Sequence, residues 1–209
     1  STLHQSGLGA LYLMAKEKIH PLWYSEFIPI MFFVSSIFAG LSMVIFEGSI
    51  SHKVFASQIS GPNHHAQKSI ITGLAKICAG TMFAYLFLQL LVFIHDKDWH
   101  WLFSPMGYWY LTEMLGFVML PMILFFISYR RGNPLLVRIA AILTMLGIII
   151  NRLNVTVIGF QWDMPVRYIP SWMEIVITLT VIFTEIWIFR WVINRMPVLR
   201  DSPLWARKH

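Results

Sequence analysis

The chain has 209 residues, of which 57% are hydrophobic and 12% charged, and its formal net charge at pH 7 is +6. Soluble domains have about 45–50% apolar and about 25% charged residues. The composition therefore excludes a soluble enzyme, a disordered chain and a nucleic-acid-binding protein, and it leaves an integral membrane protein. The single cysteine, Cys78, lies inside an apolar block, so a disulfide framework and an all-cysteine metal site within this chain are also excluded.

Five blocks of the chain are long and apolar enough to cross a bilayer as helices, which takes about 20 residues each. They lack the alternating pattern of a transmembrane β-strand. The predicted fold is an all-α integral membrane protein, a single transmembrane domain over residues 1–209 in which residues 1–15 are the tail of a preceding helix. The five helices are expected at about 26–47, 70–95, 106–129, 134–160 and 170–195.

Prolines and glycines refine these helices. The third, fourth and fifth helices are marked near their starts by prolines, which suit a first helical turn: Pro105, Pro134 and Pro170. Pro29 and Pro121 fall inside helices and are expected to bend them without breaking them. The second helix contains small residues, which predicts close packing against a neighbour: Gly73, Gly80, Ala75, Ala79 and Ala84.

The start of the sequence bears on its completeness. The chain begins at Ser1 inside an apolar stretch, without a basic segment followed by a cleavage site. We therefore expect it to be the C-terminal part of a longer membrane protein. Half of a functional site would then lie outside this sequence.

The distribution of Lys and Arg predicts the orientation, because cytoplasmic segments carry an excess of both. Eleven lie on the side of the first and third interhelical loops and the C-terminus: Lys53, Lys68, Lys76, Arg130, Arg131, Arg138, Arg190, Arg195, Arg200, Arg207 and Lys208. The other five are Lys16, Lys18, Lys97, Arg152 and Arg167. The C-terminus is therefore expected in the cytoplasm, with the loops at 96–100 and 163–167 on the opposite side.

Ionisable side chains at membrane depth are expensive and need a reason. They fall into two layers. The outer layer comprises Glu26, Glu113, Arg152 and Glu174, and the inner layer comprises Glu47 and Lys76, with Glu185 between the two.

Arg152 stays charged at this depth and needs an anion, for which Glu174 and Glu113 are the candidates. One interpretation is a structural ion pair between helices. The other is a polar pocket for a ligand headgroup or a proton relay. His4 is a further pocket candidate, either as a donor to a quinone carbonyl or as a satisfied interface residue.

The candidates for a proton path are Glu47, Lys76 and Glu185. Glu174 and Glu185 are eleven residues apart and share a helix face, so they could pass protons along the membrane normal, or they are an interfacial acid and a neutral core acid. Glu47 and Lys76 are either a salt bridge between the first two helices or a proton entry point. No catalytic residue and no metal site are predicted. Facing histidines for a transmembrane haem are not expected either.

Several runs resemble a known family. They are residues 3–9 (LHQSGLG), 19–23 (IHPLW), 44–49 (VIFEGS), 152–154 (RLN) and 170–174 (PSWME). In this order they are similar to the second half of the NrfD/polysulfide-reductase membrane-subunit family. The nearest members are the integral membrane, quinone-reactive subunits of periplasmic-facing nickel–iron hydrogenases.

The resemblance implies properties that the composition does not show. It implies the C-terminal part of a larger protein of about ten helices, without haem, in a bacterial or archaeal cytoplasmic membrane. Such a subunit anchors a periplasmic iron–sulfur subunit and passes electrons between it and menaquinone or ubiquinone, with proton translocation in some members. Hydrogenase, reductase or multihaem cytochrome subunits are the implied catalytic partners, so the chain itself would hold no catalytic centre.

The family's quinone pocket is attributed largely to its first helical bundle. Only His4, Glu47, Arg152 and Glu174 therefore transfer through matching motifs, without individual roles. Two alternatives stay open beside the respiratory subunit, with membrane lipids and no nucleic acid as contacts in each case. One is an ion-coupled transporter that uses the same buried charges. The other is a purely structural membrane anchor.

Overall fold

The structure is a computed structural model that describes residues 2–54, 63–160, 162–163 and 170–195, with side chains except those of 51–54, 63–68, 193 and 194. Its helices in chain order are α1 (Thr2–Tyr12), α2 (Ile28–Val54), α3 (Asn63–Asp96), α4 (Pro105–Glu113), α5 (Leu120–Arg131), α6 (Pro134–Leu153) and α7 (Trp172–Arg195). Short 3-10 helices follow α1 at Leu13–Lys18 and precede α4 at Asp98–Phe103. In the described residues the only β-type pairing is an isolated bridge between Ile19 and Phe160.

Five stretches are long and apolar enough to cross a membrane: Ile28–Ile50, Ser69–Asp96, Pro105–Arg131, Pro134–Ile158 and Trp172–Val192. The predicted all-α membrane fold with five transmembrane helices is confirmed. The first two helices extend past the predicted ends, to Val54 and from Asn63. Hydropathy marks only the part of a helix that lipid covers, whereas the backbone hydrogen bonds continue beyond it.

Local chemistry fixes several helix ends. Ser104 accepts a hydrogen bond from the Gly107 N–H at 3.0 Å and caps α4, whose first residue is Pro105. Asn133 caps α6 in the same way, through the Leu135 N–H at 3.0 Å. Gly132, with φ of 59°, ends α5 in the left-handed conformation that glycine adopts at low cost.

The third predicted helix is interrupted where the sequence predicts a bend. Residues Met114–Met119 form a π-helical turn between α4 and α5, and Pro121 lies in the first turn of α5. Pro121 has no N–H to offer to the carbonyl four residues earlier, so the wider turn re-pairs the backbone there. A second π-helical turn, Asn154–Ile158, continues α6.

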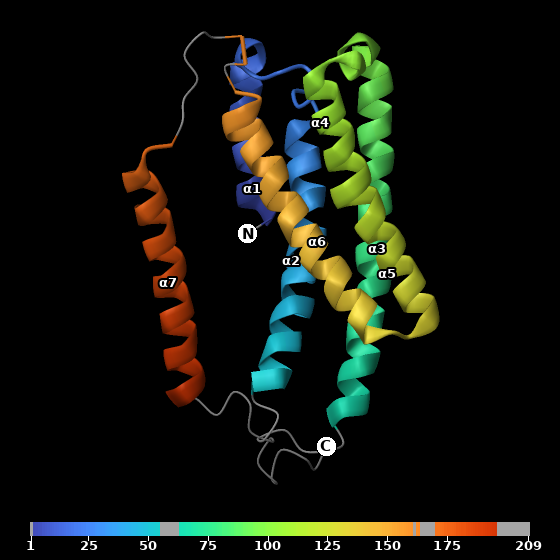
Figure 1. Cartoon of the computed structure of the whole chain (residues 1–209), viewed down its shortest axis with the longest axis vertical. Helices are drawn as coiled ribbons and strands as arrows, with labels where there is room; N and C mark the ends of the chain where they lie inside the picture. The colour runs from blue at the N-terminus through green and yellow to red at the C-terminus, as the bar shows by residue number, and fades with distance from the viewer. Residues whose placement is uncertain (1, 55–62, 161, 164–169, 196–209) are drawn as a thin grey trace.

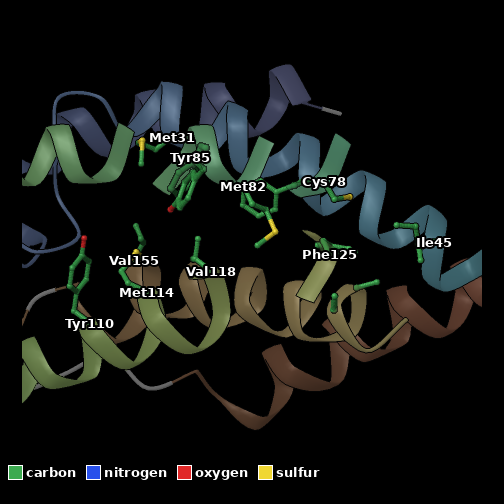
Figure 2. Packing of buried hydrophobic residues seen from close by; sticks show 14 of the residues in the cluster. Met31, Ile45, Cys78, Met82, Tyr85, Tyr110, Met114, Val118, Phe125 and Val155 are labelled. Carbon is green, nitrogen blue, oxygen red and sulfur yellow. The ribbon is translucent and has the colours of Figure 1, made fainter. Parts of the chain in front are cut away.

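Helices α2, α3, α5 and α6 pack around a common core, with α1 against α2 (Figure 1). Figure 2 shows buried side chains from these helices meeting between them, among them Met82, Tyr85 and Phe125. Gly147 allows α6 to approach the π-helical turn closely, because a Cβ there would stand 2.7 Å from the Cβ of Phe117. The predicted close packing of small residues on α3 is found at Ala75, which is buried, and at Ala79, which packs against the core. It is not found at Gly73 and Gly80, where a Cβ would meet nothing within 4 Å.

Helix α7 differs from the others because it stands beside the bundle in Figure 1. Every side chain from Trp172 to Trp191 is exposed. In Figure 1 the C-terminal ends of α2, α5 and α7 point toward the same end of the molecule. Four of the basic residues used to predict the orientation lie outside the described residues: Arg167, Arg200, Arg207 and Lys208.

Candidate functional site

Glu113 is the centre of a buried polar cluster between α2, α4 and α6. Its side chain is 2% exposed. Its carboxylate accepts three hydrogen bonds, from Trp23 Nε1 at 2.8 Å, Asn151 Nδ2 at 2.6 Å and Asn154 Nδ2 at 2.6 Å. Three N–H donors around two oxygens suit an ionised carboxylate, which is acceptor-only.

Arg152 supplies the positive charge of this cluster. Its Nη1 donates to Asn151 Oδ1 at 2.9 Å, so Asn151 links the guanidinium to Glu113. Its Nη2 donates to Ser35 Oγ on α2 at 2.8 Å, and the guanidinium lies 3.6 Å from the ring centroid of Phe32. An aromatic face and hydroxyl and amide partners replace the water that a buried guanidinium loses.

The two π-helical turns flank this cluster. Glu113 is the last residue of α4 before the turn Met114–Met119, and Asn154 begins the turn Asn154–Ile158. Asn154 is held in place because Trp109 Nε1 donates to its Oδ1 at 3.0 Å. Such turns re-aim side chains and occur frequently at functional sites.

An aromatic cap covers one side of the cluster. His20 is 1% exposed, and the rings of Trp23, Trp101 and Trp162 lie edge-on to it at centroid distances of 5.5, 5.1 and 4.8 Å. Its ring Nδ1 accepts the Leu22 N–H at 3.2 Å, and the backbone N–H of His20 donates to the Gly159 carbonyl at 2.8 Å. Burial lowers the pKa of His20 to about 4, so the ring is neutral at pH 7.

One cavity adjoins the cluster and a second lies beside the first, and both are lined by Gln89, Phe93, Tyr110 and Met114. The first, about 40 Å³, lies against Trp23 and Asn151 and reaches the end of α3 at Asp96 and Asp98. It has room for a few water molecules, at about 10–15 Å³ each. The second is an apolar groove of about 360 Å³ between α3, α4 and the 3-10 segment between them, near Trp99. Gln89 Nε2 donates to the Tyr110 hydroxyl at 2.7 Å, so this pair is the polar part of the wall that the groove and the cavity share.

The structure brings together two of the four pocket candidates, Glu113 and Arg152. Glu174 is not the partner of Arg152, which is a correction: Glu174 is exposed on α7 and accepts the Ser171 N–H at 3.2 Å. His4 lies exposed on α1. Depth along a helix predicts height in the membrane but not the direction in which a side chain points.

The three proton-path candidates do not form one chain. Glu185 is exposed on α7, Glu47 is half-buried near the end of α2, and Lys76 is exposed on α3. Lys76 stands 5.6 Å from the ring centroid of Tyr129, and in the described residues it has no carboxylate within 4 Å. The salt-bridge alternative for Glu47 and Lys76 is therefore wrong.

Four residues of the cluster are not among the candidates predicted from the sequence: Trp23, Ser35, Asn151 and Asn154. Trp23 and Asn154 lie within the runs that carry the family resemblance, and Asn151 precedes Arg152 directly. An amide next to a buried charge is the one local signal that could have been used. In the described residues no group of three His, Cys, Asp or Glu side chains could hold a metal ion.

The fold and this buried charge cluster define a multi-pass all-α membrane protein with a polar site inside its helix bundle. The family model described as "Polysulphide reductase, NrfD" matches residues 5–164. The chain belongs to this family, which confirms the resemblance found in the sequence.

Two curated proteins show how this chain compares with relatives. A protein of Nitratidesulfovibrio vulgaris, which carries no functional name, is 42% identical over 100% of this chain and 54% of its own length. The probable Ni/Fe-hydrogenase 2 b-type cytochrome subunit of Escherichia coli is 26% identical over 100% of this chain and 52% of its own length. The chain thus spans about half the length of the curated relatives it matches. No solved structure matches it.

Proposed function

We propose that the chain is part of the membrane-anchor subunit of a respiratory oxidoreductase, which passes electrons between a periplasmic iron–sulfur subunit and the quinone pool. Family membership and the hydrogenase name of the Escherichia coli relative support this proposal. The membrane would be a bacterial or archaeal cytoplasmic membrane, with the C-terminus cytoplasmic. The catalytic partner would be a hydrogenase, a reductase or a multihaem cytochrome.

One observation carries the assignment of a quinone site: an apolar groove and a cavity that reaches the buried acid cluster share a wall that contains a hydrogen-bonded pair. The groove is apolar apart from Gln89 and Tyr110, which suits the ring of menaquinone or ubiquinone with its tail in lipid. Either side chain can donate a hydrogen bond to a quinone carbonyl. Behind them lies the cavity that reaches the Glu113 cluster.

Proton supply gives the acid cluster its role. A quinone that takes up two electrons must also take up two protons to become quinol, so a site inside the membrane needs a route to water. The cavity reaches Asp96 and Asp98 at the end of α3. Burial, and secondarily the neighbouring Asp96, raises the pKa of Asp98, while His100 opposes the change. The Asp98 carboxyl therefore holds a proton more readily than an ordinary Asp.

The term "b-type cytochrome" in the name of the Escherichia coli relative raises the question of haem. His20 is the one buried histidine of the described residues. Its Nδ1 is occupied by a backbone N–H, and three tryptophan rings enclose it. A haem plane has no room against this ring.

Purification of the intact complex from native membranes, with mass spectrometry of its subunits and a quinone reduction assay, tests the proposal. We expect iron–sulfur and catalytic subunits and turnover that depends on quinone. A membrane protein that copurifies with no redox subunit would overturn it and favour the ion-coupled transporter. A redox complex whose quinone turnover is unaffected by changes at Tyr110 and Glu113 would leave this chain a structural anchor.

A further inference from the structure

A second groove lies at the other end of the bundle, between α3 and α5. It has a volume of about 490 Å³, and its walls are apolar, with Phe83, Ile123 and Phe126 among them. Gly80 leaves it open, because a Cβ there would meet nothing within 4 Å. The groove is therefore an open hollow on the surface of the bundle, with Phe83, Ile123 and Phe126 exposed along it.

Basic side chains edge this groove at its end near the last turn of α5. Lys76 lines it, with its Nζ 5.6 Å from the ring centroid of Tyr129. Arg130 lies beside it, with its guanidinium 5.0 Å from the ring centroid of Phe126. In the described residues neither cation has a carboxylate within 4 Å. Positive charge therefore gathers at one end of an apolar groove without a protein anion to balance it.

The groove near Trp99 provides an internal comparison. It has a similar apolar lining between the same helix α3 and the segment leading into α4, but no Lys or Arg lines it. An apolar tail with a neutral head fits that groove. An apolar tail with an anionic head fits the groove at Lys76, because charge at the interface adds to the affinity of a basic pocket between helices.

We propose that the groove between α3 and α5 binds an anionic phospholipid. An acyl chain would lie along Phe83, Ile123 and Phe126, and the phosphate would be held by Lys76 and Arg130 at the end of α5. This inference rests on the membrane fold alone and does not depend on the quinone site. Basic pockets between transmembrane helices bind anionic headgroups in this way.

Native mass spectrometry of the full-length protein tests this proposal. The protein is titrated in parallel with phosphatidylglycerol, with phosphatidylcholine of the same acyl chains and with inorganic phosphate. We expect the wild type to retain phosphatidylglycerol in preference to phosphatidylcholine and to retain no phosphate. Lys76→Gln should weaken phosphatidylglycerol binding about fivefold and leave phosphatidylcholine unchanged.

Two further variants make the result specific. Gly80→Leu fills the groove and should weaken binding of both lipids, because the added side chain occupies the place of the acyl chain. Arg138→Gln removes an exposed cation of α6 that does not line the groove, and it should leave both affinities unchanged. Equal retention of the two lipids by the wild type would overturn the proposal. So would an effect of Arg138→Gln as large as that of Lys76→Gln.

Discussion

Helices α6 and α7 are both apolar, are similar in length and carry ionisable residues, but only α6 packs into the bundle. Helix α6 buries one face made mostly of small residues, including Ala140, Ala141 and Gly147. Helix α7 contains no Gly, Ala or Ser from Trp172 to Arg195 and buries no described side chain. Small residues allow helices to approach, and close approach gives a buried charge its partners.

Polar groups are satisfied in different ways on the two helices. On α6, Arg152 finds Asn151 and Ser35, and through Asn151 it is linked to Glu113. On α7, Thr180 and Thr184 donate to carbonyls four residues earlier in the same helix. The partners of the buried Glu113 thus come from several segments of the chain. The threonines of the exposed α7 pair within their own helix.

The largest expected effect is the loss of the buried carboxylate. Glu113→Leu leaves Arg152 and three N–H donors without an anion, so the free energy of unfolding should fall by about 3–5 kcal/mol. Glu185→Leu, the same change on α7, should leave stability within about 0.5 kcal/mol of wild type. Thermal unfolding in detergent measures both. Equal losses would show that the cluster contributes no more than an exposed acid.

The enclosed His20 predicts a dependence of stability on pH. Its pKa of about 4 in the folded protein lies below the usual value of about 6.5, so the folded state binds the proton less readily. Stability is therefore complete above about pH 6.5 and decreases by about 3 kcal/mol as the pH falls to about 4. His20→Asn keeps an acceptor for the Leu22 N–H but does not titrate. Unfolding measured between these pH values should show a flatter dependence for this variant, and an unchanged slope would contradict the prediction.

Gly147 tests the close approach of α6 to the π-helical turn. Gly147→Ala places a methyl group 2.7 Å from the Cβ of Phe117 and should cost about 1–3 kcal/mol. Gly80→Ala is the matched control, because its methyl group meets nothing within 4 Å and alanine favours a helix. The difference between their unfolding midpoints measures the packing effect. Similar midpoints for the two variants would rule out a tight contact at Gly147.

The sequence predicts the five membrane spans because the length and hydropathy of a span follow from bilayer thickness. It also predicts the starts of α4 and α6 from Pro105 and Pro134. It does not predict that Asn151 links Arg152 to Glu113. That link depends on two π-helical turns, which a 3.6-residue period cannot reveal. The sequence also does not predict that Glu174 and Glu185 are exposed, because the packing of the helices decides which of their faces are buried.

Two tyrosines of α4, Tyr110 and Tyr108, allow a functional comparison that rests on the smallest structural change, the loss of one hydroxyl group. Tyr110 is buried, lines both cavities of the proposed quinone site and accepts a hydrogen bond from Gln89. Tyr108 lies two residues earlier and is 61% exposed. Replacing either by Phe removes one hydroxyl group and preserves the ring.

Quinone reduction by isolated native membranes, compared at equal amounts of assembled complex, tests the central proposal most directly. We expect Tyr110→Phe to lower quinone turnover about tenfold, the value of one hydrogen bond at the site. Tyr108→Phe and Glu185→Gln should keep wild-type turnover. Full turnover in Tyr110→Phe together with a loss in Glu185→Gln would contradict the proposal and move the functional acids from the packed bundle to α7.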